Sequence, residues 1–239
     1  MLSIITPVLN GKVYIEENIK AISRLSVPFE HIIVDGGSTD GTIEKISLYP
    51  HVKLIMQNDR GGMYSAINSG IKEASGEYVA YVNCDDIIDP DKFSLMYNSI
   101  NDSEYDLIYS DSFLKYSETK RSEYFKSAEY LFSYFIKNGI MPFNQPGSIY
   151  TKKVFNTVGG FDSQNFKFCG DLHFFRKVIA LEGIKIKYLN IPTVTFLVHP
   201  DSLTSLNSGT FYEEYKRGLI PMPTFFTRAI YFISRLLRL

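Results

Sequence analysis

The sequence has little cysteine and no excess charge of either sign. Its two cysteines, Cys84 and Cys169, are too few for a disulfide framework or a cysteine-based zinc site, and they are consistent with a reducing compartment. Lys and Arg number 25 against 26 Asp and Glu, so the net charge of -1 predicts no broad electrostatic attraction to nucleic acid. Internal repeats are missing. The apolar N-terminal run is too short for the hydrophobic region of a signal peptide, and it predicts a strand.

The length and the hydrophobic pattern indicate one α/β domain. With 239 residues and 45% hydrophobic content, the chain can bury one full core and carry a short appendage. Strands are predicted at Leu2–Val8, His31–Asp35, Val52–Met56 and Tyr78–Val82, with helices between them at Ile15–Ile22, Thr42–Leu48 and Met63–Ala74. This alternation predicts a parallel sheet, whose ligands bind beyond the carboxyl ends of the strands.

The pattern changes after Asp89-Pro90, which suits the N-cap and first position of a helix. Strands are then predicted at Asp106–Tyr116, Lys185–Leu189 and Thr193–Val198, and helices at Tyr124–Ile136 and Leu172–Leu181. We therefore expect a nucleotide-binding half, residues 1–101, fused to an acceptor half, residues 102–220, around one mixed and mainly parallel sheet.

Two polar segments follow predicted strands. The turn Gly36–Thr42 lacks both the Lys of a phosphate-binding P-loop and the glycine spacing of a dinucleotide fold, so it predicts either a tight turn or part of a site. Asn83-Cys84-Asp85-Asp86 comes directly after a buried strand, where carboxylates must face a polar cleft or lose their hydration. Such oxygens suit Mg²⁺ or Mn²⁺ bound together with substrate phosphates, and the alternative is an acidic turn that caps the next helix.

These segments together resemble the family 2 glycosyltransferases, which have a GT-A fold with a Rossmann-like nucleotide-binding half. The resemblance rests on Ser3–Asn10, Ile32–Thr42 and Gly76–Asp86, and it continues in the same order through Gly159–Asp162 and Gly170–Arg176. It covers most of the chain up to about Ser202. The run Gly61–Gly70 is most similar to bacterial members that assemble O-antigen and related surface polysaccharides.

The resemblance implies roles for individual residues. The positions expected to bind a UDP-sugar are Thr6, Pro7, Leu9, Asp35, Asn83, Cys84 and Asp85. Asn83-Cys84-Asp85 stands at the family's DxD position, with Asn83 in place of the first Asp, so Asp85 is the expected ligand of Mn²⁺ or Mg²⁺. Asp171 matches the general base of inverting members, which accepts the proton of the acceptor hydroxyl as it attacks.

Three further residues are candidates with open alternatives. Arg60, in the loop after the third strand, is either a nucleotide contact or a solvated loop cation. His199 follows a late apolar strand and is either a second metal ligand or a surface histidine. Gln145 lies where related enzymes carry a His-Gln pair, which implies a place on the acceptor side.

The C-terminal segment 221–239 predicts an amphipathic helix. After Pro221 and Pro223, a helical pattern over Thr224–Leu239 places Arg228, Tyr231, Arg235 and Arg238 on one stripe beside a wide apolar face. Internal arginines exclude a membrane span and favour a helix lying on an anionic membrane surface. The alternative is packing on the domain or on a second copy of the chain.

The expected function is that of an inverting, metal-dependent glycosyltransferase. It would move a sugar from a UDP-sugar to a lipid-linked glycan in bacterial surface polysaccharide biosynthesis, as a cytoplasmic protein peripheral to the inner face of the cell membrane. A sugar nucleotidyltransferase is the first alternative, but no Gly-rich, Lys- or Arg-bearing loop follows the first strand. A non-catalytic carbohydrate- or nucleotide-binding protein is the second, and the joint presence of Asp85 and Asp171 argues against it.

Overall fold

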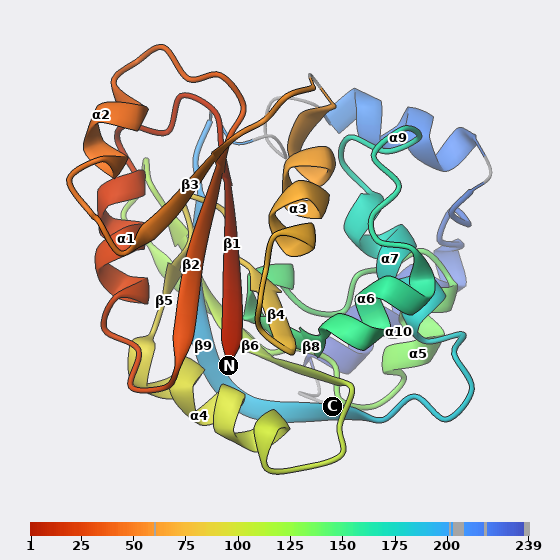
Figure 1. Ribbon diagram of the computed structural model, residues 1–239. Coiled ribbons are helices and arrows are strands. Elements are labelled where there is room, and N and C mark those ends of the chain that lie inside the picture. The colour runs from red at the N-terminus through yellow and green to blue at the C-terminus, as the bar shows by residue number, and fades with distance from the viewer. Residues whose placement is uncertain (60, 201, 203–207, 218, 237–239) are drawn as a thin grey trace.

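The computed structural model describes residues 1–59, 61–200, 202, 208–217 and 219–236 (Figure 1). The strands in these residues are β1 Leu2–Val8, β2 Phe29–Asp35, β3 Val52–Met56, β4 Tyr78–Tyr81, β5 Ile87–Ile88, β6 Leu107–Tyr116, β7 Ser122–Phe125, β8 Ser148–Thr151 and β9 Ile186–Val198. The helices are α1 Ile15–Ile22, α2 Thr42–Ile46, α3 Gly62–Lys72, α4 Pro90–Asn101, α5 Phe132–Lys137, α6 Lys152–Val158, α7 Gly170–Val178, α9 Ser208–Lys216 and α10 Phe225–Leu236, with a 3-10 turn at Gln145–Gly147.

The described strands form one mixed sheet in the order β3-β2-β1-β4-β8-β6-β9-β5, and β7 pairs with β6. The first four strands are parallel to one another, as predicted. β8 runs antiparallel between β4 and β6, and β9 is parallel to β6. The predicted mixed, mainly parallel sheet is thus confirmed, and the carboxyl ends of β1, β2 and β4 lie along one edge.

Helices cover both faces of the sheet (Figure 1). Neighbouring side chains of a strand point to opposite faces. Ile4 therefore packs with Ile22 of α1 and Phe93 of α4, whereas Ile5 packs with the core formed by α3, α6 and α7. All seven residues of β1 are buried because helices lie over it on both sides. Because β1 is buried over its whole length, polar residues first reach the surface where this strand ends.

Two predictions for the second half were wrong. Tyr124–Ile136 is not one helix, because Ser122–Phe125 forms the strand β7 on β6 and the helix α5 spans only Phe132–Lys137. The two strands predicted at 185–189 and 193–198 are one continuous strand, β9, whose register against β6 shifts near Asp111 and absorbs the extra residues. Both outcomes depend on pairing with β6, which local patterns do not report. The segments β8, α6 and β5 were not predicted.

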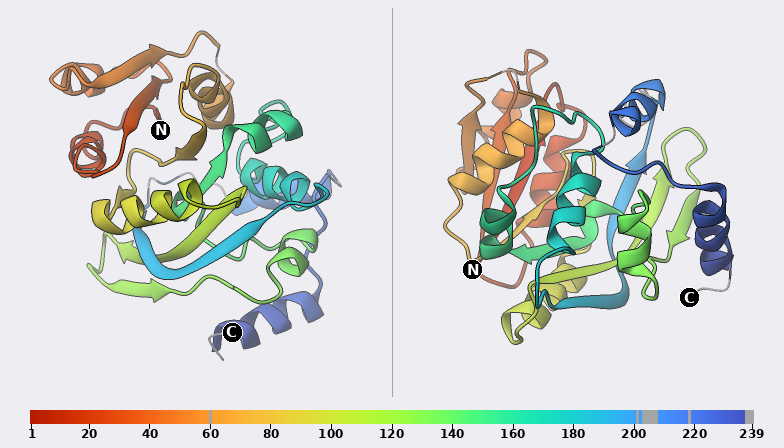
Figure 2. Two further views of the ribbon diagram at one scale, coloured as in Figure 1. Left: turned by 60° about the horizontal axis from the view of Figure 1, so that its bottom comes forward. Right: turned by 90° about the vertical axis from the view of Figure 1, so that its right-hand side faces the viewer.

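The C-terminal helix was predicted correctly as a helix, and α10 spans Phe225–Leu236; Arg238 and the rest of 237–239 lie outside the described residues. Figure 2 shows α10 at the periphery, beside α5 and β7. The Tyr231 ring contacts Phe135 at 5.0 Å between centroids, and the Arg235 guanidinium lies 4.2 Å from the centre of the Phe125 ring.

Within the part of the chain that the structure describes, no helix is both long enough and apolar enough to cross a membrane.

Candidate functional site

The acidic turn after β4 is held in place by a buried asparagine of α1. Asn18 Nδ2 donates to the carbonyl oxygens of Asn83 at 3.0 Å and Asp86 at 2.9 Å. Its Oδ1 lies 3.4 Å from the hydroxyl of Thr6, which also contacts His31 Nε2 at 2.9 Å. Burial lowers the pKa of His31 to about 3, so its ring is neutral. The side chain of Thr6 is therefore a buried support of this turn, and the whole residue is buried.

The two adjacent carboxylates of this turn have different environments. Asp86 is buried and accepts from Asn83 Nδ2 at 3.0 Å and from the Leu197 backbone at 3.2 Å. Burial, with the charge of Asp85, raises its pKa well above the usual value. The side chain of Asp85 is 21% exposed and its Oδ2 lies 2.9 Å from His199 Nε2. Asp86 is therefore structural, and Asp85 is the carboxylate that faces the site.

His199 is not the surface residue that the alternative interpretation required. Its side chain is only 6% exposed, and its Nδ1 lies 3.3 Å from the hydroxyl of Tyr14. The Tyr14 ring packs against the imidazole with centroids 4.9 Å apart. The imidazole is thus held between Tyr14, the N-cap residue of α1, and Asp85, with one ring nitrogen directed at each.

The sheet explains why Asp85 and His199 meet although 114 residues separate them. β5 follows Asp85 and Asp86 directly and pairs antiparallel with β9, with Ile87 opposite Thr195. Continuing this pairing in the antiparallel direction brings Leu197 to Asp86, where its N–H binds the carboxylate, and leads the chain to His199. The strand pair β5–β9 therefore delivers the imidazole to the acidic turn.

The Gly-rich turn after β2 is organised around Asp35. One carboxylate oxygen accepts from the backbone N–H of Gly37 at 2.8 Å and Ser38 at 2.7 Å, while Oδ2 is buried without a partner among the described atoms. Gly37 has φ +98°, a conformation that favours glycine. Asn10 connects the turn to β1, because its N–H donates to Ser38 Oγ at 2.8 Å. Both a turn and a candidate binding position are therefore present here.

Asp171 occupies the first turn of α7, next to the buried phenol of Tyr64 from α3. The Tyr64 hydroxyl donates to Asp171 Oδ1 at 3.3 Å and to the Phe168 carbonyl at 2.8 Å, and it accepts from Asp171 N at 3.1 Å. Burial raises the pKa of Asp171 to about 6, although hydrogen bonds from the Leu172 N–H and from Tyr64 oppose the shift. A carboxylate of this pKa is ionised at neutral pH and still basic enough to accept a proton.

The phenol of Tyr81, the last residue of β4, is influenced by the charges of both acidic regions. Burial raises the pKa of its phenol well above the ordinary value. The negative charges of Asp171 and, to a smaller extent, Asp86 add to this shift. The charges of both carboxylates thus act on one phenol at the carboxyl end of β4. Gln145 is buried beside the same strand end and donates to the Tyr81 carbonyl at 3.1 Å, and its Oε1 has no partner among the described atoms.

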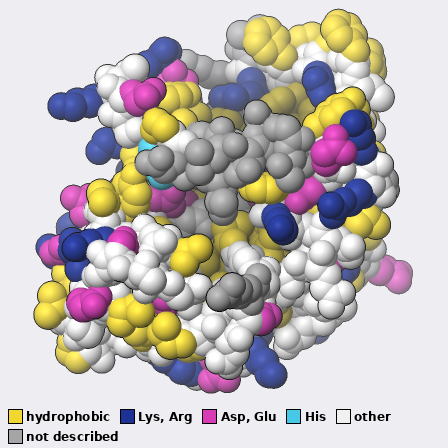
Figure 3. Space-filling view, turned by 90° about the horizontal axis from the view of Figure 1, so that it is seen from above, with side chains coloured by type: hydrophobic (Ala, Val, Ile, Leu, Met, Phe, Trp, Pro, Cys, Tyr) yellow, Lys and Arg dark blue, Asp and Glu magenta, His cyan; other side chains and the backbone are white. Residues whose placement is uncertain are grey.

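The positions of the remaining predicted residues say less about their roles. Leu9 is exposed at the end of β1, Pro7 is buried in that strand, and Cys84 is half-buried with its sulfur against Gly11. Arg60 lies outside the described residues. Figure 3 looks onto the carboxyl ends of β1 and β2, and shows Lys, Arg, Asp and Glu interspersed on this face rather than one broad charged area.

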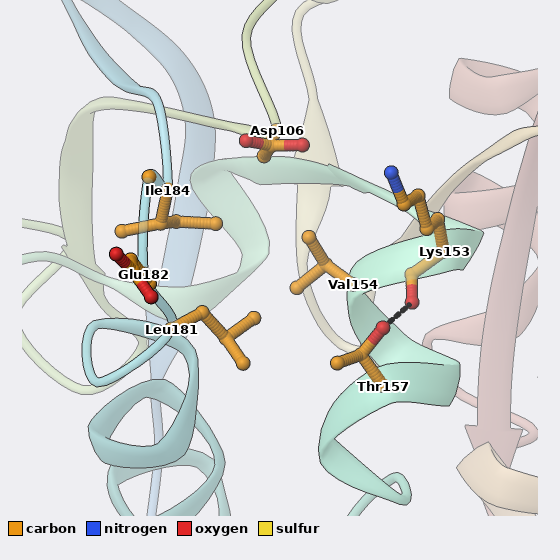
Figure 4. A pocket seen from close by; sticks show the side chains of 8 residues that line it. Asp106, Lys153, Val154, Thr157, Leu181, Glu182 and Ile184 are labelled. Atoms are coloured by element: carbon orange, nitrogen blue, oxygen red, sulfur yellow. Dashed lines mark hydrogen bonds between the residues drawn. The ribbon is translucent and has the colours of Figure 1, made fainter.

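A surface pocket elsewhere in the molecule is separate from these residues. It lies between the start of β6, α6 and the turn after α7, and Figure 4 shows it lined by Asp106, Lys153, Val154, Thr157, Leu181, Glu182, Gly183 and Ile184. Because β6 is parallel to β9 and antiparallel to β8, Asp106 marks the opposite edge of the sheet from Asp85. The candidate site is therefore the edge with Asp35, Asp85 and Asp171.

Sequence reasoning missed the residues that support the site. Tyr64 lies inside the recognised run Gly61–Gly70, so its position was available although its contact with Asp171 was not. Asn18, Tyr14 and Glu214 belong to no motif, and their contacts form only after distant segments pack. No group of three or more His, Cys, Asp or Glu side chains suited to a single metal ion occurs in the described residues.

The chain matches the model of glycosyl transferase family 2 over residues 3–160. This match covers more than half of the chain, so the protein belongs to glycosyl transferase family 2. The predicted family is confirmed.

Two curated relatives illustrate the similarity. A glycosyltransferase named GlyG from Streptococcus pneumoniae is 28% identical over 130 residues, which are 52% of this chain and 43% of that protein. A PGL/p-HBAD biosynthesis glycosyltransferase from Mycobacterium tuberculosis is 25% identical over 231 residues, 94% of this chain and 85% of the relative. The chain thus spans less than half of GlyG but most of the mycobacterial protein.

Solved structures share the fold at low sequence identity. TarS of Staphylococcus aureus, residues 1–349 in complex with UDP-GlcNAc, has a TM-score of 0.71 at 20% identity, covering 90% of this chain and 64% of that one. The mannosyltransferase PcManGT of Pyrobaculum calidifontis, in complex with GDP-Man and Mn²⁺, has a TM-score of 0.68 at 18% identity, covering 91% and 64%. The predicted GT-A fold is confirmed, and its representatives bind different nucleotides.

Proposed function

We propose that this protein transfers a sugar from a UDP-sugar to a glycan acceptor with inversion at the anomeric carbon. Asp85 and His199 would hold a divalent cation, Mn²⁺ or Mg²⁺, and Asp171 would act as the general base. The observation that carries the proposal is the 2.9 Å contact between Asp85 and His199, two residues from opposite halves of the chain that meet where the donor diphosphate is expected.

The donor atoms of this pair fit a divalent cation. Carboxylate oxygen and imidazole nitrogen are both good ligands of Mn²⁺, and a cation held by two protein groups binds phosphate oxygens and water at its other positions. Tyr14 fixes the orientation of the His199 ring from the opposite side, as outer partners of metal-binding histidines commonly do. A bound cation would offset the negative charge that develops on the departing diphosphate.

The protein's own groups supply nucleotide recognition and proton transfer. The Asp35 oxygen that has no partner in the described part of the chain is suited to accept from an N–H of uracil, and the neighbouring turns of β1 and β2 would surround the base through Pro7 and Leu9. Asp171 would take the proton of the acceptor hydroxyl as that oxygen attacks the anomeric carbon and the bond to the diphosphate breaks. The buried Gln145 at the end of β4 would orient the acceptor side.

Calorimetry of UDP binding tests the donor site. We expect wild-type protein to bind UDP at least about tenfold more tightly with Mn²⁺ than with EDTA, and Asp85→Ala to lose most of this difference. Asp86 is no suitable control because it is structural, so exposed Asp91→Ala serves instead. Equal UDP affinity with and without metal would contradict the metal site, and tighter binding of GDP would contradict the uridine assignment.

For the acceptor, we propose a lipid-linked glycan of a bacterial surface polysaccharide, reached through contact of α10 with an anionic membrane at the inner face of the cell membrane. α10 packs on the domain through Tyr231, Thr227 and Ser234, so the domain-packing alternative holds for that side. The opposite side leaves Phe225, Phe226 and Phe232 exposed by 89%, 69% and 64%.

The charge of this segment favours an anionic partner. From Tyr215 to Leu239 the sequence contains no Asp or Glu, and its cations are Lys216, Arg217, Arg228, Arg235 and Arg238. Each Lys or Arg near an anionic lipid surface contributes on the order of 1 kcal/mol, and the phenylalanine rings add the burial of apolar area. Lipid therefore fits the exposed side better than an acidic or a purely apolar protein surface does.

Flotation with vesicles rich in phosphatidylglycerol tests the membrane contact. The full chain is expected to float at low salt, and both a chain ending at Met222 and the triple variant Phe225→Ser, Phe226→Ser, Phe232→Ser are expected to stay in solution. Leu48→Ser is the matched control, because Leu48 is an exposed apolar residue on another surface. If all forms float equally or none floats, the membrane proposal is wrong and a second copy of the chain becomes the alternative, visible by ultracentrifugation.

A further inference from the structure

A buried carboxylate near the C-terminus binds the segment that leads to Asp171. Glu214 of α9 is 2% exposed, and its two oxygens accept from the backbone N–H of Lys167 at 2.7 Å, Phe168 at 3.3 Å and Cys169 at 2.8 Å. A carboxylate that receives several N–H groups in a buried place is strongly bound, and its loss leaves those donors unsatisfied.

These N–H groups stand at the entrance of α7. Cys169 is the N-cap residue of this helix, and no side chain of the N-cap itself makes a capping hydrogen bond. Free N–H groups and the positive end of the helix dipole both favour a negative charge at this point. Glu214 supplies that charge from another helix, 45 residues further along the chain than Cys169.

The same segment is held from the other side by Tyr64. The Tyr64 hydroxyl binds the Phe168 carbonyl and both the backbone N–H and the carboxylate of Asp171. The stretch from Lys167 to Asp171 is therefore fixed between Glu214 and Tyr64, with Glu214 on its N–H groups and Tyr64 on its carbonyl side. The position of the Asp171 carboxylate depends on both.

We propose that Glu214 is a positioning residue for Asp171, which sets the first turn of α7 so that the Asp171 carboxylate faces the acceptor hydroxyl. This inference rests on the role proposed above for Asp171. A second effect follows from charge, because the negative charge of Glu214 contributes to raising the pKa of Asp171, after burial as the main cause. Among the described residues, the phenols of Tyr64, Tyr81 and Tyr215 and the thiol of Cys169 also interact electrostatically with Asp171.

The sharpest test replaces the carboxylate without changing its size. In Glu214→Gln, one oxygen becomes an NH₂ group that opposes backbone donors, so part of the N–H set loses its acceptor. Glu213→Gln is the matched control, because Glu213 is the adjacent residue of the same helix and forms an exposed ion pair with Lys216 at 2.9 Å. Glu214→Asp keeps the charge and should restore part of any loss.

We expect Glu214→Gln to lower kcat at least about tenfold while UDP affinity and donor KM stay within about twofold, since the donor residues are on other segments. Amide hydrogen exchange of Lys167, Phe168 and Cys169 should accelerate. The acid limb of the pH–rate profile should move to lower pH, because removal of a neighbouring negative charge makes Asp171 easier to ionise. The control should match wild type in every measurement.

Other outcomes overturn the inference in distinct ways. Unchanged kcat and unchanged amide exchange would show that Glu214 does not position the Asp171 carboxylate. Equal losses of UDP affinity, kcat and thermal stability, with no shift of the pH profile, would make Glu214 a purely structural residue. If wild type transfers no sugar, the proposed function fails instead, and amide exchange with ¹³C NMR titration of the Asp171 carboxyl still decides whether Glu214 positions it.

Discussion

The donor edge and the base region of this protein are built in different ways. Asp35 is the last residue of β2 and Asp85 lies in the turn after β4; turn atoms and Asn18 from the first 86 residues hold them, and Leu197 and His199 add contacts from the second half. Asp171 is fixed by Tyr64, which is 107 residues away in sequence, and by Glu214 acting on the preceding segment. The difference teaches that strand ends and local turns place the donor carboxylates, to which β9 adds His199, whereas long-range side-chain contacts place the base.

Replacing the base itself should give the largest effect. Asp171→Asn keeps the shape of the side chain but removes its ability to take a proton, so transfer is expected to fall by roughly 10² or more while UDP affinity stays nearly unchanged. Radiolabelled sugar transfer and calorimetry measure the two quantities, with exposed Asp102→Asn as control. Turnover near the wild-type rate would place the base on another residue and end the distinction between the two regions.

His199 is the point at which the second half reaches the donor edge. Its replacement by alanine should weaken Mn²⁺-dependent UDP binding by about tenfold, on the scale measured for partners of metal sites, and should have little further effect in the Asp85→Ala background. His51→Ala is the control, because His51 is an exposed histidine of the donor half. Independent, additive losses would show that the two residues do not hold one cation.

The smallest effect is expected from the phenol beside the base. In Tyr64→Phe, Asp171 loses a hydrogen bond that lowers its pKa, so the acid limb of the rate profile, expected near pH 6 in wild type, should move to higher pH. This shift is opposite to the one expected from Glu214→Gln. A several-fold loss of rate at pH 7 should accompany it.

Tyr150→Phe provides the comparison for that measurement. The Tyr150 hydroxyl is buried without a partner among the described residues, and its ring packs on Phe174 of α7. Removing this hydroxyl should leave the profile in place, since no hydrogen bond to the base is lost. Identical shifts in both variants would mean that general repacking, rather than the bond to Asp171, sets the pH dependence.

The fold of the first half could be predicted from the sequence because each strand is a short apolar run closed by a turn. β1 and β3 have the predicted bounds, and Asp89 and Pro90 begin α4 as their cap geometry requires. The second half has weaker local patterns. Ser122–Phe125 forms a strand because it pairs with β6. β9 is continuous because a shift in its register against β6 takes up the extra residues in its middle.

The candidate site divides in the same way. Asp35, Asp85 and Asp171 stood in recognisable motifs, and the structure brings all three to one edge of the sheet. The metal-ligand alternative for His199 implied a place beside Asp85, but the pairing of β5 with β9 that brings it there could not be predicted from the sequence. Asn18 and Glu214 were missed for a related reason: a polar residue on a helix gives no sign of the backbone groups that it will bind after folding. The division of the domain 1–220 into halves at 101/102 and the individual binding roles stay predictions.

The pairing of β5 with β9 also limits how the chain can change in length. One residue inserted between Thr195 and His199 would reverse which side of the sheet each later side chain faces and would carry the imidazole about 3.3 Å along the strand, beyond reach of Asp85. The number of residues along the end of β9 is therefore fixed in any variant that keeps the contact between Asp85 and His199.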